Sequence, residues 1–297
     1  MLKTAKKILW LAVNQLAQRA SRNYIAGAKL EDAQRVSTHL NKLGYWVTLG
    51  YWDSENDDLT VVTDAYHSSI EHLASLAGKN YLSIKLPAIN FDHGKFQELL
   101  AKSQESNIPL HFDSLAPENA NHNYAFAMKY ANQSSYGIGC TLPARWQRSI
   151  ADADIVSQLE LNVRVVKGQW KDPDYPDLDA RSAYLNIINR LAGKLCHVRV
   201  ATHDLELAKK SLAILKEKNT YCELELLYGL PINGLVALAN QLNIPVRIYI
   251  AFGHAYLPYA LSSISKHPYM VWKLFKEAYK SDYISTFKEC TSNNNVR

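Results

Sequence analysis

The stretch HVRVATHDLELAKKSLAILKEKNTYCELELL, residues 197–227, contains one complete repeat of the pattern that decides the fold. A β-rich run at 197–201 is followed by an amphipathic helical pattern at 205–216 and by a second β-rich run at 223–227. Two parallel strands need a long crossover connection, which is usually a helix. The stretch therefore predicts a strand, a helix and the next parallel strand.

The same pattern extends over most of the chain. The starts of eight β-rich apolar runs are 22 to 36 residues apart, and the gaps hold helical candidates such as 234–241. The eight predicted strands are 45–49, 81–84, 109–112, 138–142, 162–166, 197–201, 223–227 and 245–250. Eight βα units in about 250 residues are typical of a (β/α)8 barrel, whereas a doubly wound sheet normally stops at fewer strands. We therefore predict an α/β fold of the TIM-like (β/α)8 class.

The regions outside this repeat set the expected domain boundaries. Residues 1–40 are predicted as an N-terminal helical arm, in which Asp32 and Ser37 start or interrupt turns. Residues 41–290 are predicted as one barrel domain, and residues 291–297 as a frayed polar tail. Because 12 Gly and 10 Pro are spread along the 297 residues, no linker divides the chain.

Composition excludes several classes of protein. The chain is 47% hydrophobic, and its 33 Lys and Arg against 28 Asp and Glu give a net charge of +5, too mild and dispersed for a nucleic-acid binder. The apolar run 8–13 is too short for a transmembrane segment. The four cysteines form no CxxC pair, which favours reduced thiols. We expect a protein that is cytoplasmic or peripheral at a membrane.

Polar residues gather at the predicted strand ends, where (β/α)8 barrels carry their chemistry. These residues are Lys85, Asp113, Arg164, Lys167, Gly168, Thr202, His203, Asp204, Tyr228, Gly229, Gly253 and His254. Each has a structural explanation when taken alone, and the turn 202–204 in particular suits the N-cap of the next helix. Because they coincide at one end of six strands, we predict a functional site there.

The residue types narrow the chemistry. Lys167 followed by Gly168 lets the backbone approach a ligand beside a cation, which suits a phosphate or an electron-rich ring. The sequence has no HExxH motif or carboxylate cluster, so no metal is expected. It also lacks the GxSxG elbow and the GxGxxG turn, so neither hydrolase nor Rossmann chemistry is indicated.

Residues 163–170, VRVVKGQW, resemble the RLVKGAYW segment of the proline dehydrogenase family, flavin-binding barrels that oxidise proline to pyrroline carboxylate. Five further segments resemble that family in the same order along the chain. They are YLSIKL at 81–86, HFD at 111–113, VATHD at 200–204, LLYG at 226–229 and VRIYIAFG at 246–253. Six collinear segments identify the chain as a relative of this family.

The resemblance implies non-covalent FAD along the C-terminal face of the barrel. The matching cofactor positions are Arg164, Lys167, Gly168, Trp170, Thr202, His203 and Glu225, the last in place of a family glutamine. The substrate side would consist of Lys85, Asp113, Tyr249 and Tyr259, and the catalytic residues of Lys85, Asp113 and Tyr259. A cation beside the flavin ring would stabilise its reduced, anionic form.

The match fails where the family binds the carboxylate of proline. In YLPYALSSISK, residues 256–266, Ser262 and Ser263 replace the arginine pair of the family, and Lys266 replaces a glutamate. Loss of a buried ion pair to a carboxylate costs about 3–5 kcal/mol. Arg145, in LPAR where the family has LQ(A/S)Y, is a candidate replacement for substrate binding.

We therefore expect a flavin-dependent dehydrogenase or oxidase for an amine or imino substrate other than free proline, of the kind found in specialised metabolism. Its electron acceptor would be a quinone or oxygen. Three alternatives stay open: a non-catalytic barrel that has lost flavin, a true proline dehydrogenase with a rearranged carboxylate site, and a Schiff-base lyase that uses Lys85 or Lys167. Pro143, which replaces a flavin-contacting family residue, favours the first of these.

Overall fold

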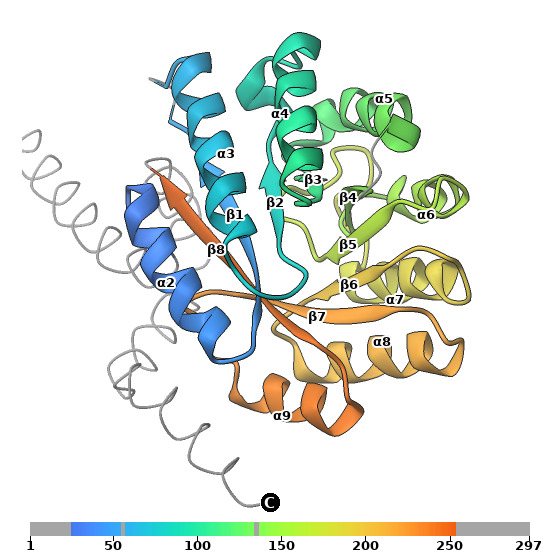
Figure 1. Ribbon diagram of the computed structural model, residues 1–297. Helices are drawn as coiled ribbons and strands as arrows, with labels where there is room; N and C mark the ends of the chain where they lie inside the picture. The colour runs from blue at the N-terminus through green and yellow to red at the C-terminus, as the bar shows by residue number, and fades with distance from the viewer. Residues whose placement is uncertain (1–24, 55–56, 134–136, 254–297) are drawn as a thin grey trace, which may run out of the picture.

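The computed structural model describes residues 25–54, 57–133 and 137–253 of the chain. Eight parallel strands form a closed barrel in sequence order, and the first strand pairs with the last (Figure 1). The strands are β1 (Trp46–Trp52), β2 (Tyr81–Ile84), β3 (Leu110–Phe112), β4 (Ile138–Pro143), β5 (Asn162–Val166), β6 (Val198–Ala201), β7 (Cys222–Leu227) and β8 (Val246–Gly253). The predicted (β/α)8 class is confirmed, and each predicted strand is present to within three residues at either end.

Helices cover the outside of the barrel (Figure 1). The α-helices are α2 (Leu30–Lys42), α3 (Leu59–Ala74), α4 (His93–Glu105), α5 (Ala120–Tyr130), α6 (Ser149–Gln158), α7 (Ala180–Leu191), α8 (Leu205–Glu217) and α9 (Asn233–Leu242). Three short 3₁₀ helices are η1 (Leu86–Ile89), η2 (Pro117–Asn119) and η3 (Ala131–Gln133). Four helices begin after an aspartate whose side chain accepts a backbone N–H of the first turn, which explains where they start: Asp58, Asp92, Asp179 and Asp204.

The sequence prediction for Asp32 and Ser37 is wrong, because α2 runs through both residues without a break. Asp32 lies in the first turn, where its negative charge suits the helix dipole. Ser37 is fully buried, and its hydroxyl lies 2.7 Å from Nε2 of His72 in α3. The serine therefore joins two helices and does not end one. The rest of the predicted arm, residues 1–24, and the predicted tail, 291–297, lie outside the described residues.

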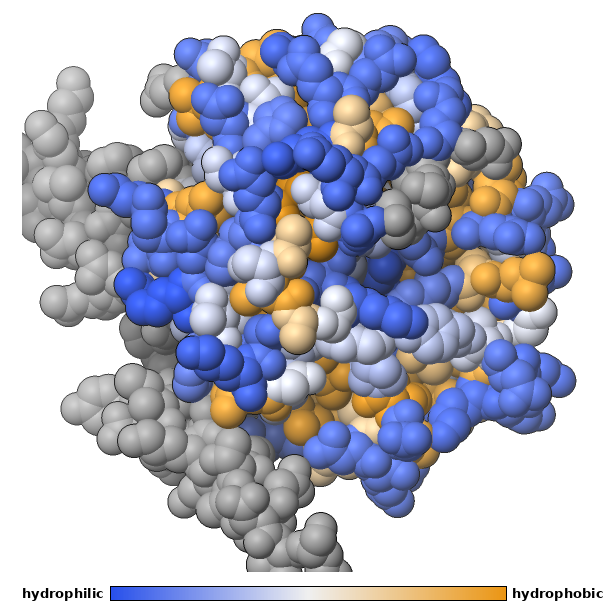
Figure 2. Space-filling view, in the orientation of Figure 1, coloured by the Kyte–Doolittle hydropathy of each residue, from blue (hydrophilic) through white to orange (hydrophobic). Residues whose placement is uncertain are grey.

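The face shown in Figure 2 is mostly hydrophilic where the chain is described, and its apolar side chains form small, separate patches. In the same described ranges, no helix is long and apolar enough to cross a bilayer. The apolar side chains are concentrated between the outer surface of the barrel and the helices, as Val163 and Val165 of β5 are. This layer is the hydrophobic core that holds the barrel together.

The inside of the barrel is polar. Alternate residues of a strand point to opposite faces, so the side chains between the buried valines of β5 point inward. Eleven polar or titratable side chains occupy such inward positions: Thr48, Tyr81, Ser83, His111, Thr141, Arg164, Arg199, Glu223, Glu225, Arg247 and Tyr249. All of them except Thr48 take part in hydrogen bonds or ion pairs, which form one group at each end of the barrel. His111 links the two groups, because it lies 3.4 Å from Nη1 of Arg199 and 2.9 Å from the hydroxyl of Thr141.

The group at the N-terminal end centres on Glu223, which is completely buried. Its carboxylate accepts hydrogen bonds from Arg247 and, at 3.2 Å, from Nε of Arg199, and it lies 3.3 Å from Nε2 of His197. Burial alone would raise the pKa of Glu223, but Arg247 and its other cationic neighbours hold that pKa well below its usual value. Glu223 is therefore an ionised carboxylate in the barrel interior.

Two glycines make room for large inward side chains. A Cβ atom on Gly50 would lie 2.1 Å from the hydroxyl of Tyr249, and one on Gly139 would lie 2.2 Å from Nδ1 of His111. Any larger residue at either position would displace the ring beside it. Gly50 therefore leaves room for the phenol of Tyr249 inside the barrel. This phenol lines the cavity at the C-terminal ends of the strands, which is described below.

Candidate functional site

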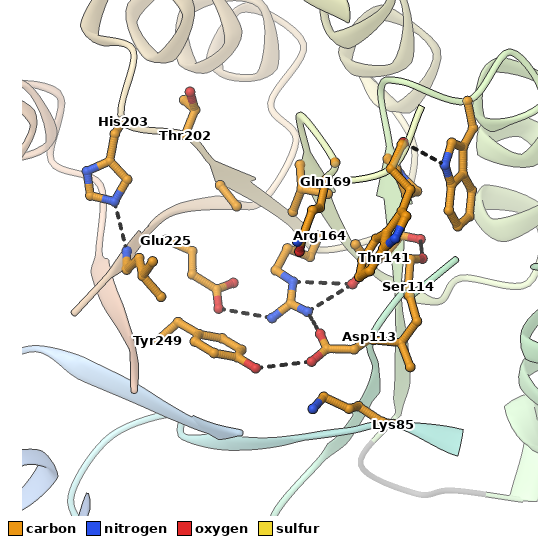
Figure 3. Close-up of a pocket in the computed structure, with 18 of the residues that line it drawn as sticks. Lys85, Asp113, Ser114, Thr141, Arg164, Gln169, Thr202, His203, Glu225 and Tyr249 are labelled. Carbon is orange, nitrogen blue, oxygen red and sulfur yellow. Dashed lines mark hydrogen bonds and ion pairs between the residues drawn. The ribbon is translucent and has the colours of Figure 1, made fainter. Parts of the chain in front are cut away.

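A cavity of about 320 Å³ opens at the C-terminal ends of the strands. Each of the eight strands, or the residue directly after it, contributes to the lining; one contributor per strand is Trp52, Lys85, Asp113, Thr141, Arg164, Ala201, Glu225 and Tyr249. Figure 3 shows Asp113, Thr141 and Glu225 around the guanidinium of Arg164. The position of the cavity is the one in which (β/α)8 enzymes carry their active sites.

Arg164 of β5 forms the floor of this cavity (Figure 3). One terminal nitrogen of its guanidinium donates to Asp113 and, at 3.0 Å, to the hydroxyl of Thr141. The other terminal nitrogen lies 3.4 Å from Oε1 of Glu225. Arg164 is 5% exposed, so its charge is compensated by the protein and not by water. The sequence predicted Arg164, Asp113 and Glu225 as site residues, and the structure brings all three together.

Two tyrosines donate to these carboxylates. The hydroxyl of Tyr249 donates to Oδ2 of Asp113 at 3.0 Å, and that of Tyr81 donates to Glu225 at 2.7 Å. Burial raises the pKa of Tyr249 to about 12, and burial followed by the nearby Glu225 raises the pKa of Tyr81 to about 12. Both phenols therefore stay protonated at neutral pH and act as hydrogen-bond donors.

Lys85 lies just after β2 on the opposite side of Asp113 from Arg164 (Figure 3). It is 5% exposed, and its Nζ forms an ion pair with Oδ1 of Asp53 at 3.0 Å. Burial lowers the pKa of Lys85, and Asp53 opposes this effect. Sequence reasoning missed Asp53 because it ended the first strand at residue 49, whereas β1 continues to Trp52 and carries Asp53 into the site.

The charges in and next to the cavity do not balance. Among the described residues, Lys85 and Arg164 provide two positive charges, whereas Asp53, Asp113 and Glu225 provide three negative ones. Each cation is already paired with a carboxylate. The described floor therefore attracts a cationic or neutral ligand group and offers no free cation to a carboxylate.

Thr202 and His203, predicted to bind cofactor, line the cavity but also stabilise their own turn. The hydroxyl of Thr202 accepts from the amide of Asp204 at 3.1 Å, and Asp204 caps α8, so the helix-cap explanation of this turn is confirmed. Nε2 of His203 accepts from the amide of Leu227 at 2.9 Å, and its Nδ1 lies 3.3 Å from the carbonyl of Pro231. Burial lowers the pKa of His203, so the ring is neutral. Both ring nitrogens are thus occupied by backbone groups.

We expect His203→Ala to lower the free energy of unfolding by about 0.5–1.5 kcal/mol, because the partly buried amide of Leu227 loses its hydrogen-bond acceptor. Urea denaturation followed by circular dichroism measures the effect. His39→Ala, on the exposed face of α2, is the matched control and should change stability little. Equal stability of the His203 variant and wild type would show that this hydrogen bond contributes nothing.

Of the three residues predicted to bind cofactor in the loop after β5, only two line the cavity. Gly168 and Trp170 line the cavity, whereas the side chain of Lys167 is exposed and does not. Gly168 has a φ of +88°, and a Cβ there would lie 2.9 Å from Cβ of Pro143, so only glycine brings this loop against the end of β4. Arg145 lies in a neighbouring cavity. Tyr228, Gly229 and Gly253 are described but are not among the residues that line the cavity. The remaining predicted residues lie outside the described residues: Tyr259, Ser262, Ser263, Lys266 and His254.

The fold and the site together define a (β/α)8 barrel with a ligand cavity at its C-terminal face above a buried charge network. By sequence the chain is 23% identical over 268 residues to "Proline dehydrogenase 1" of Bacillus subtilis subsp. natto, covering 84% of this chain and 87% of that protein. It is 22% identical, with the same coverage, to the protein of that name from Bacillus subtilis strain 168. No model of a known protein family matches the chain. The chain is therefore similar in sequence to proline dehydrogenases over most of its length.

Solved structures show the same fold. Proline utilization A from Bdellovibrio bacteriovorus, inactivated by N-propargylglycine, superposes with a TM-score of 0.71 at 14% identity over 93% of this chain. The protein of the same name from Corynebacterium freiburgense superposes with a TM-score of 0.66 at 14% identity over 90% of this chain. The matched region is 34% and 32% of those longer chains, respectively. The barrel observed here is therefore the architecture of one part of each of those proteins.

Proposed function

We propose that this protein is an FAD-dependent dehydrogenase that oxidises the CH–NH bond of an amine or imino substrate other than free proline. The observation that carries the proposal is the charge of the cavity floor. Two described cations are paired with three carboxylates, which favours a substrate nitrogen that carries a proton and disfavours a carboxylate beside it. The similarity to proline dehydrogenases supports the redox chemistry.

The residues of the cavity fit a flavin ring. Its walls include flat or branched apolar side chains, among them Val166, Leu226 and Trp170, above the guanidinium of Arg164. The candidates to hold the ring and its ribityl chain are Arg164, Gly168, Trp170 and the turn 202–203. Flavin, when bound, supplies the two-electron oxidant that takes a hydride from the carbon next to the substrate nitrogen. A quinone or oxygen would serve as the electron acceptor.

The side chains of Asp113, Tyr249 and Lys85 would bind and orient the substrate amine. Asp113 lines the cavity, and its carboxylate accepts a hydrogen bond from the hydroxyl of Tyr249 at 3.0 Å (Figure 3). It would attract a protonated amine, and Tyr249 and Arg164 hold its carboxylate in place. Lys85, whose pKa burial lowers, releases a proton more readily than an exposed lysine and is the candidate to exchange a proton with the substrate nitrogen.

Free proline fits this site poorly. Its carboxylate would lose water without meeting an unpaired cation among the described lining residues. An uncompensated buried charge of this kind costs about 3–5 kcal/mol, or roughly two to four decades in affinity. Ser262 and Ser263, where the family has arginines, provide hydroxyl groups but no charge.

The test is anaerobic flavin reduction by a panel of secondary amines that lack a carboxylate, pyrrolidine among them, compared with proline. We expect at least one such amine to reduce the flavin about 100-fold faster than proline at equal concentration. Rapid reduction by proline would identify a proline dehydrogenase with a rearranged carboxylate site. A purified protein without the flavin absorbance band, also after incubation with FAD, would favour the non-catalytic alternative.

A further inference from the structure

A second cavity, of about 280 Å³, lies between the loops that follow β4 and β5, and we call it the loop cavity. Its lining includes Arg145, Lys171, Tyr175 and Asp177. Nε of Arg145 is buried and has no hydrogen-bond partner among the described residues. A buried donor without a partner is unfavourable, so the loop cavity contains an unmet requirement for an acceptor.

The loop cavity is adjacent to the cavity at the C-terminal ends of the strands, which we call the functional cavity. Trp146 and Trp170 line the functional cavity, and the residues directly next to them in the chain, Arg145 and Lys171, line the loop cavity. The two loops are joined by hydrogen bonds: the amide of Arg145 donates to the carbonyl of Lys167 at 3.1 Å, and Nε1 of Trp146 donates to the carbonyl of Trp170 at 3.2 Å. The two cavities therefore lie next to each other along the same pair of loops.

The charge of the loop cavity is the opposite of that of the functional cavity. Arg145 and Lys171 provide two positive charges against the single negative charge of Asp177. A guanidinium is a planar set of donors that matches the oxygens of a carboxylate or a phosphate. Ala180, the first residue of α7, also lines the loop cavity, and the N-terminus of that helix is capped by the side chain of Asp179.

We propose that the loop cavity binds the anionic group, a carboxylate or a phosphate, of an extended amine substrate whose CH–NH bond lies in the functional cavity. This inference rests on the proposed function and specifies its substrate class: an amine with a negative charge several bonds away from the reacting carbon. Arg145 would bind the anionic group of this substrate at a distance from the amine. No cation next to the substrate nitrogen is then needed.

The site itself is tested with inorganic phosphate, titrated into the full-length protein and followed by ³¹P NMR. We expect saturable binding to wild type and at least about tenfold weaker binding to Arg145→Gln. Lys171→Gln should weaken binding less and serves as an independent variant if the first one fails to fold. Lys194→Gln, the same change of charge on an exposed loop between α7 and β6, is the control and should bind as wild type does. Absence of saturable binding, or equal binding by the Arg145 variant, would overturn the proposal.

The link to the substrate is tested with pyrrolidine and with pyrrolidines that carry a carboxylate on alkyl tails of increasing length. Calorimetry measures their binding independently of flavin reduction. We expect at least one tail length to bind about tenfold more tightly than pyrrolidine in wild type, and Arg145→Gln to remove that advantage while FAD content stays unchanged. Loss of FAD from the variant would mean that the loop cavity holds the cofactor pyrophosphate, which overturns the proposal. Tail-dependent binding without flavin reduction by any amine would contradict the proposed function alone.

Discussion

Arg164→Met is expected to lower the free energy of unfolding by about 3–5 kcal/mol, because it leaves Asp113 and Glu225 as buried carboxylates without their shared cation. The same substitution should deplete bound flavin, since the guanidinium forms the floor under the proposed ring site. Guanidinium chloride denaturation measures the first effect, and flavin absorbance per mole of purified protein measures the second.

A second substitution separates the charge effect from lost packing. Adding Glu225→Gln to the Arg164 variant removes one of the two unpaired carboxylates, so part of the lost stability should return. Arg35→Met is the matched control, because Arg35 is exposed and its partner in the ion pair, Asp32, is only partly buried. A variant of Arg164 as stable as wild type, with full flavin content, would show that the floor network contributes to neither property.

The second large effect is expected at the other end of the barrel interior. Glu223→Gln should cost about 3–5 kcal/mol at neutral pH, because Arg199 and Arg247 lose the carboxylate that compensates them. The neighbouring cations hold the pKa of Glu223 below its unfolded value, so its ionised form stabilises the native state at pH values above about 4.3. This contribution is lost as the pH falls below that value.

The stability difference between wild type and Glu223→Gln should therefore narrow in acid. Urea denaturation at a series of pH values from neutral to about 3 measures it. Glu98→Gln, an exposed residue whose ion-pair partner is Lys95, is the control and should follow wild type throughout. A difference that stays constant with pH would show that the pKa of Glu223 is the same in the folded and the unfolded protein.

The fold was predictable from sequence because helix and strand periodicities differ and the repeat occurs eight times. Val163 and Val165 flank Arg164 in the alternating pattern of a strand, and the observed β5 has the predicted ends. The exception in α2 has a tertiary cause: Ser37 has a low helix propensity, but its contact with His72 of another helix satisfies its hydroxyl. No local pattern contains that information.

The site was predictable only in part. Lys85 and Asp113 follow strand ends directly, so their convergence follows from barrel geometry. Ser83 and Thr141, which contact Arg164, were missed, although alternation within their strands is a signal that could have identified them. The separation of Lys167 from Gly168 was not predictable, because it depends on the φ of +88° at Gly168 and on the contact with Pro143.

Arg164 contacts residues that are distant in the sequence: Ser83 of β2, Asp113 after β3, Thr141 of β4 and Glu225 of β7. Until the chain has brought these strands together, the guanidinium and both carboxylates remain hydrated, and each closing loop costs entropy before any contact compensates for it. The charge arrangement that selects the ligand therefore does not exist in any fragment of the barrel. During synthesis the recognition floor can form only after β7 has left the ribosome.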